Sequence, residues 1–229
     1  MSEPFWQITA KTKRDAILAA IPQEWRISNI PSTKEQVDVT TYIEQYLSEE
    51  ELHITACSAE QIAQHVASGS RTAETVTRAF CHRAALAHQF LHCLHEIFFD
   101  AAIQDAKKLD AYFREHGKTI GPLHGVPISL KDQFHIKDVE TSMGYVGWIG
   151  TFEGRKNTGK EKVYESELVK ILRAAGAVLY VKTSVPHTLM SGETVNNIIG
   201  YTWNPKNRNL TAGGSSGGEG ALIGCRGCE

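Results

Sequence analysis

The chain has 229 residues, an apolar content of 41% and a formal net charge of −2 at pH 7. This composition is ample for a hydrophobic core, and the small net charge gives no reason to expect a nucleic acid as a partner. No apolar run approaches the roughly 20 residues that a membrane-spanning helix needs, and the first residues lack the pattern of a secretory signal. We therefore expect a globular, cytoplasmic protein.

Helical patterns dominate the first half of the chain. Apolar side chains fall on one face of a predicted helix over residues 6–20. Ser58 and Gln61 have the spacing of a capping box, which starts a second helix that Gly69 closes. Thr72 can cap a third helix.

Strand and helix patterns alternate further along the chain. The predicted elements are strands over residues 94–99, 126–130 and 177–181 and helices over residues 100–116 and 165–175, the first of which Gly117 ends. This alternation predicts an α/β fold in which helices cover a mixed β-sheet. We expect residues 1–57 to form an N-terminal helical extension that precedes this domain, which occupies residues 58–229.

The stretch LTAGGSSGGEGALIG, residues 210–224, places Ser215 and Ser216 between two glycine pairs. Three interpretations are open from these residues alone. A glycine-rich turn before a helix can hold phosphate, although the spacing fits no standard motif and Glu219 would oppose an anion. A flexible linker is the second interpretation, although a linker would not run into an apolar, helix-like segment. The third is a catalytic serine, which needs a base nearby.

Lys131 is the candidate base because it directly follows a buried strand. Desolvation at that place would lower its pKa below the ordinary value of about 10.4 and favour the neutral amine, which can accept a proton. The alternative interpretation is a surface lysine paired with Asp132.

The cysteines and histidines predict neither disulfides nor a metal site. Five scattered cysteines make an oxidised framework improbable, and we interpret the pair Cys225 and Cys228 as incidental thiols in a tail. Four histidines lie close in sequence without other ligands at metal-binding spacing, so we expect them to be surface or partly buried residues. They are His82, His88, His92 and His95.

Two segments together resemble the amidase signature enzymes, and within them the fungal acetamidase type. The first is GPLHGVPISLKDQF, which contains Lys131, and the second runs from VKTSVPHTLM to GGSSGGEGALIG. The resemblance covers most of the chain from about Ser58 onward, in the family's order and spacing. It implies the amidase signature fold, of which residues 58–229 would be an incomplete N-terminal part. It also implies hydrolysis of small-molecule amides without a metal or other cofactor, and is compatible with a homodimer.

The resemblance further implies a Ser–cis-Ser–Lys triad. Lys131 would act as base and later as acid, and Ser215 would relay the proton and enter the site through a cis peptide bond from Gly214. Leu189 would contact the substrate through its backbone, together with Ser215. The supporting loop would comprise Gly213, Gly214, Ser216, Gly217 and Gly218.

The triad's acyl-accepting serine lies, in the family, in a GTDIGGSIR-like segment roughly two dozen residues beyond the relay serine, next to oxyanion-binding N–H groups. The 229 residues do not contain that segment. We therefore expect a C-terminally truncated amidase that is nearly inactive alone. The alternative is a non-catalytic fragment or pseudoenzyme that acts only by binding a partner. Three positions depart from the family pattern. Cys228 stands where relatives are expected to carry serine, and Ser184 and His187 make the substrate preference less certain.

Overall fold

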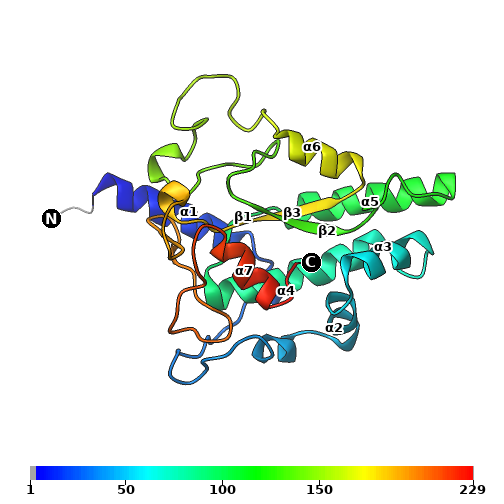
Figure 1. The fold of residues 1–229 in the computed structure, drawn as a ribbon, viewed down its shortest axis with the longest axis horizontal. Coiled ribbons are helices and arrows are strands. Elements are labelled where there is room, and N and C mark those ends of the chain that lie inside the picture. Colours follow the sequence, from blue (N-terminus) through cyan, green and yellow to red (C-terminus); the bar gives the residue numbers. More distant parts are fainter. Residues whose placement is uncertain (1–3, 229) are drawn as a thin grey trace.

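A three-stranded sheet forms the centre of the computed structural model, which describes residues 4–228 (Figure 1). Its strands are β1 (Leu94–Ile97), β2 (Pro127–Lys131) and β3 (Val178–Thr183), in the order β1-β3-β2. β3 runs antiparallel to β1 and parallel to β2. The predicted mixed sheet is therefore confirmed, and each of the three predicted strands is found.

Helices cover both faces of this sheet, as predicted. Because successive side chains of a strand point to opposite faces, Tyr180 packs into the main core and Leu179 into a second core with Val169. Figure 1 shows one helix above the strands and another below them. The helices involved are α6 (Glu167–Ala174) on the second core and α4 (Ala73–Leu91) and α5 (Phe99–His116) on the main core.

The segment before residue 58 packs onto the same main core. Ile21, Val39 and Ile43 are buried there together with side chains of α4. Ile17 lies in a smaller core with Ile198. The helices of this part are α1 (Phe5–Ala19), α2 (Glu49–Thr55) and, just after it, α3 (Ala59–Ala67). The boundary between residues 57 and 58 stays a prediction.

Short elements complete the described chain. Two-residue strands β4 (Val195–Asn196) and β5 (Gly200–Tyr201) pair antiparallel, and helix α7 (Gly217–Gly224) follows them. Single 3₁₀ turns lie at Gln23–Trp25, Tyr42–Tyr46, Val146–Trp148 and His187–Leu189.

The local signals for helix ends are confirmed. The Ser58 hydroxyl accepts from the Gln61 N–H at 3.3 Å, and the Gln61 side chain accepts from the Ser58 N–H at 2.9 Å. Thr72 caps α4, and Gly117 ends α5 in the left-handed conformation. A second capping box, Ser48 with Glu51, starts α2 and was not predicted.

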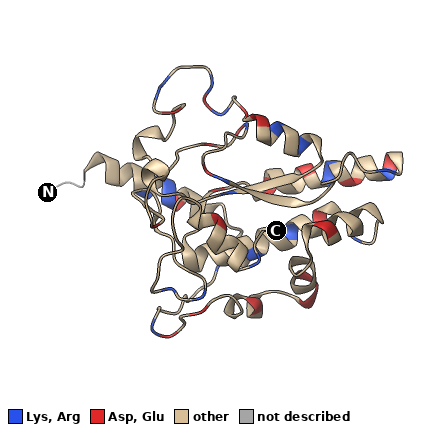
Figure 2. Ribbon diagram, in the orientation of Figure 1, with Lys and Arg blue, Asp and Glu red and all other residues tan. Residues whose placement is uncertain are grey.

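Acidic and basic residues are mixed along α5 and α6, as Figure 2 shows, in keeping with the small net charge. Among residues 4–228, no helix has the length and apolar character needed to cross a membrane.

Two expectations about cysteines and histidines are wrong. Cys225 and Cys228 do not lie in a loose tail but are buried in the main core beside α4. Three of the four neighbouring histidines are buried and hydrogen-bonded. His82 bonds to Glu51, His88 to the Leu94 N–H and His95 to Asn196. Buried polar groups need such partners, and residues distant in sequence supply most of them.

Candidate active site

The predicted base lies at the edge of the sheet where β2 and β3 end. Lys131 is the last residue of β2 and pairs in parallel register with Thr183, the last residue of β3. The carboxyl ends of neighbouring parallel strands meet at one edge, and ligand sites of α/β sheets form there. Ser184 and the following loop leave the sheet at the same place.

Helix α7 begins at this edge and brings the glycine-serine segment with it. The Gly218 N–H donates to the Ser184 carbonyl at 3.2 Å. One residue on, Glu219 accepts from the Thr183 hydroxyl at 2.9 Å and from the Ser129 hydroxyl at 2.6 Å. Lys131 and the turn that contains Ser215 are therefore held at one end of the sheet by contacts between β2, β3 and α7.

Glycine is required where α7 touches the neighbouring chain. A Cβ at Gly218 would lie 2.2 Å from the Ser184 nitrogen, and one at Gly217 would lie 2.1 Å from the Thr194 hydroxyl oxygen. Neither distance is compatible with any side chain. These glycines allow the helix to approach the strand ends.

The turn before α7 has a different backbone from the predicted one. All peptide bonds within residues 4–228 are trans, so the cis bond expected between Gly214 and Ser215 is not found. A cis bond without proline costs roughly 3–4 kcal/mol and needs surroundings that enforce it. Here the chain turns at Gly213, whose φ is +104°, and the Thr194 hydroxyl bonds to the carbonyls of Gly213 and Gly214.

Lys131 is partly buried, and its surroundings lower its pKa. Desolvation by burial lowers its pKa, while the charge of Glu219 raises it and so opposes the shift. The alternative pairing with Asp132 is wrong, because that carboxylate is fully buried and pairs with Lys182 at 2.8 Å. The Lys131 amine forms no ion pair with any residue that the structure describes.

Ser215 is partly exposed, and Ser216 is exposed at the start of α7. Within the described chain no hydrogen bond joins Lys131 to Ser215. The structure places the two residues on elements that meet, and the proton relay between them stays a prediction.

Glu219 is the residue of this site that the sequence did not single out. Burial raises the pKa of its carboxyl, while hydrogen bonds from Ser129 and Thr183 and the nearby Lys131 lower it. Its carboxylate joins the two strand ends to α7. The signal available was a single acidic residue inside a run of glycines.

The loop that carries Leu189 runs beside the glycine-serine turn. A Cβ at Gly214 would lie 3.0 Å from the Ser191 carbonyl oxygen. Leu189 has a positive φ of 59°, and its N–H donates to the Pro186 carbonyl at 3.1 Å. Its predicted backbone contact with a substrate is not tested by this geometry.

The three positions that depart from the family pattern have structural partners. The Ser184 hydroxyl bonds to that of Thr202 at 2.6 Å, and His187 lies 3.3 Å from the Val195 carbonyl. Cys228 accepts from the Ser129 N–H at 3.3 Å and from its hydroxyl at 2.9 Å.

Residues 4–228 contain no group of three or more His, Cys, Asp or Glu side chains arranged to hold a metal ion.

Comparison with known proteins identifies the class. The Amidase family profile matches residues 75–229. The chain is 48% identical over 222 residues to an acetamidase of Emericella nidulans, covering 97% of this chain and 39% of that relative. It is 47% identical over 227 residues to an acetamidase of Aspergillus oryzae, covering 99% and 40%.

A solved structure of a fatty acid amide hydrolase superposes with a TM-score of 0.88 at 39% identity, over 98% of this chain and 39% of the other. The chain belongs to the amidase family and has the amidase fold. It spans about two-fifths of the length of these relatives.

Proposed function

We propose that the protein represented by this chain hydrolyses small carboxamides to a carboxylate and ammonia or an amine, with Lys131 and Ser215 as its proton-transfer pair. The observation that carries the proposal is the meeting of β2, β3 and α7, which brings a partly desolvated lysine and the glycine-serine turn to one edge of the sheet. The similarity to two acetamidases supports the reaction class.

In this proposal the neutral Lys131 amine accepts a proton through the Ser215 hydroxyl while a second serine attacks the carboxamide carbon. The C–N bond then breaks, and the lysine returns the proton to the departing nitrogen. Water releases the acyl group as a carboxylate and restores the serine. Leu189 contributes a backbone contact to the substrate, and Ser216 and the flanking glycines support the turn.

The attacking serine and the oxyanion donors are assigned to a GTDIGGSIR-like segment, which the 229 residues do not contain. We therefore expect the 229-residue chain alone to form no stoichiometric adduct with a serine-directed fluorophosphonate, as measured by intact mass. A stoichiometric fluorophosphonate adduct would refute the expectation that the 229-residue chain is inactive. Sequencing the coding DNA beyond codon 229 tests whether that segment exists. A cytoplasmic location and a homodimer are further proposals.

The role of Lys131 is tested by its pKa. Trace acetylation with acetic anhydride over a series of pH values, followed by peptide mass spectrometry, gives the titration of each amine. We expect Lys131 to titrate below Lys170, an exposed lysine whose pKa is raised by Glu167. In Glu219→Gln, which removes the charge that opposes the shift, Lys131 should titrate lower still. Equal titration of the two lysines would refute the proposed base.

A further inference from the structure

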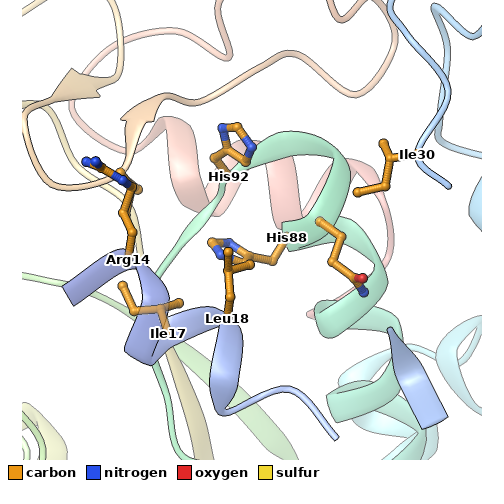
Figure 3. Close-up of a pocket in the computed structure, with 8 residues that line it drawn as sticks. Arg14, Ile17, Leu18, Ile30, His88 and His92 are labelled. Atoms are coloured by element: carbon orange, nitrogen blue, oxygen red, sulfur yellow. The ribbon is translucent and has the colours of Figure 1, made fainter. Parts of the chain in front are cut away.

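A cavity of about 230 Å³ lies between α1 and the end of α4, apart from the Lys131 edge. None of its lining residues belongs to β2, to β3 or to the glycine-serine turn. Figure 3 shows the side chains from α1 facing those from α4 across this space. The lining includes Arg14, Ile17, Leu18, Ile30, His88 and His92. For scale, a dry apolar cavity of ~150 Å³ is large enough for benzene.

A hydrogen-bond donor on a buried histidine opens onto this cavity. The Nδ1 atom of His88 accepts from the Leu94 N–H at 3.0 Å, so in the neutral ring the hydrogen is on Nε2. Burial lowers the pKa of His88 to about 3, which keeps the ring neutral. His88 is only 3% exposed, and its Nε2 atom has no partner within residues 4–228. This N–H is accessible from the cavity, where the oxygen of a ligand can accept its hydrogen bond.

Positive charge without a counter-charge lies at the same cavity. Arg14 uses only Nη1, which donates to the carbonyls of Ile198 at 2.5 Å and Asn197 at 3.3 Å. Its other nitrogens have no partner, and in the described part of the chain Arg14 forms no ion pair. The charges of Arg208 and Arg14 add to desolvation in lowering the pKa of His92. No acidic side chain lines the cavity.

We propose that this cavity is a binding site for a small monocarboxylate with a compact apolar body. The apolar part lies against Ile17, Leu18 and Ile30, and the carboxylate accepts from Arg14 and from the Nε2–H of His88. Arginine favours carboxylates because its parallel N–H groups match both oxygens. Amide hydrolysis releases a carboxylate, so the site takes the same chemical class as the product. The link between this site and the reaction product rests on the proposed function, whereas the binding of a carboxylate to the cavity does not depend on it.

Calorimetric titration of the 229-residue chain tests the proposal, with hexanoate as the probe and hexanamide as its neutral counterpart. We expect saturable one-to-one binding of hexanoate and at least tenfold weaker binding of hexanamide. Arg14→Gln should weaken hexanoate at least tenfold and leave hexanamide unchanged. By NMR, hexanoate should shift the His88 Nε2–H resonance. Absence of saturable hexanoate binding, or equal affinity for hexanoate and hexanamide, would overturn the proposal. Both results come from the unsubstituted chain, so they do not depend on whether a variant folds.

A pair of matched variants locates the site. Leu18→Trp fills the cavity from α1 and should abolish binding, whereas Leu168→Trp adds the same ring to α6, away from the cavity, and should not. The two leucines are 45% and 41% exposed, so we expect the fold to tolerate both substitutions equally. Hexanoate binding that survives Leu18→Trp would place the ligand elsewhere and refute the site.

Discussion

The contact between α7 and the strand ends can be tested by adding one methyl group. In Gly218→Ala the new carbon would lie 2.2 Å from the Ser184 nitrogen, 2.5 Å from its carbonyl oxygen and 2.6 Å from its hydroxyl oxygen. Two of these three atoms are backbone, and the Ser184 N–H is itself bonded to the Cys93 carbonyl at 2.8 Å. The helix must therefore move away from the sheet edge, because the strand end cannot.

Overpacking of this kind destabilises a core by about 1–3 kcal/mol, and the rigid backbone on both sides places this variant at the upper end of that range. The matched control is Gly220→Ala, in the same helix. There the nearest atom to an added Cβ is the Ala212 carbonyl oxygen at 3.9 Å, and the residue is exposed. Alanine in an open helical position is favoured over glycine by roughly 0.5–1 kcal/mol, so this variant should be more stable than the wild type.

Urea unfolding followed by circular dichroism measures both changes. The midpoint should fall for Gly218→Ala and rise for Gly220→Ala. The Lys131 titration should also change in Gly218→Ala, because the carboxylate of Glu219 moves with the helix. Equal stability of the two variants would show that α7 is not held against Ser184 and would remove the basis of the proposed active site.

Two buried titratable groups, His88 and Asp132, give further predictions. His88 is neutral in the fold although its ordinary pKa is 6.5, so below pH 6.5 the unfolded chain binds a proton that the folded chain excludes. The free energy of unfolding should fall as the pH is lowered from 6.5 towards 3, and this residue contributes about 1.4 kcal/mol per pH unit to the decrease. When the free energy of unfolding is measured with urea at each pH, its dependence on pH should be weaker by that amount in His88→Gln. Asp132→Asn leaves the buried Lys182 ammonium unpaired and should cost about 3–5 kcal/mol, whereas Asp15→Asn, in an exposed pair with Lys11, should cost under about 1 kcal/mol. Similar costs in the two asparagine variants would contradict the burial of that charge.

Local signals in the sequence were sufficient for most helix and strand positions. The capping residues at Ser58 and Thr72 act on N–H groups two or three residues away, so their effect is visible without knowledge of the fold. Gly117 ends its helix for the same local reason. The amidase fold and the family followed from two segments that resemble its members, and the comparisons confirm both.

The start of α7 could not be predicted in this way. Glycine has the poorest helix propensity after proline, yet the helix begins at Gly217. Its first turn is stabilised by tertiary contacts, since Gly218 bonds to Ser184 and Glu219 to two strand residues. The burial of Cys225 had a signal that we did not use, because free cysteine is among the most buried residue types.

The orientation of Lys131 was, by contrast, within reach of the sequence. Side chains of a strand alternate, so Ser129 and Lys131 share one face of β2, and Leu130 and Asp132 point to the other. The structure agrees, since Ser129 bonds to Glu219 beside Lys131 while Leu130 packs into the second core. A pairing between the adjacent residues Lys131 and Asp132 was thus excluded by the period of the strand. What the sequence could not supply was Lys182, which lies on the neighbouring strand and pairs with Asp132, so that this carboxylate is not a partner of Lys131.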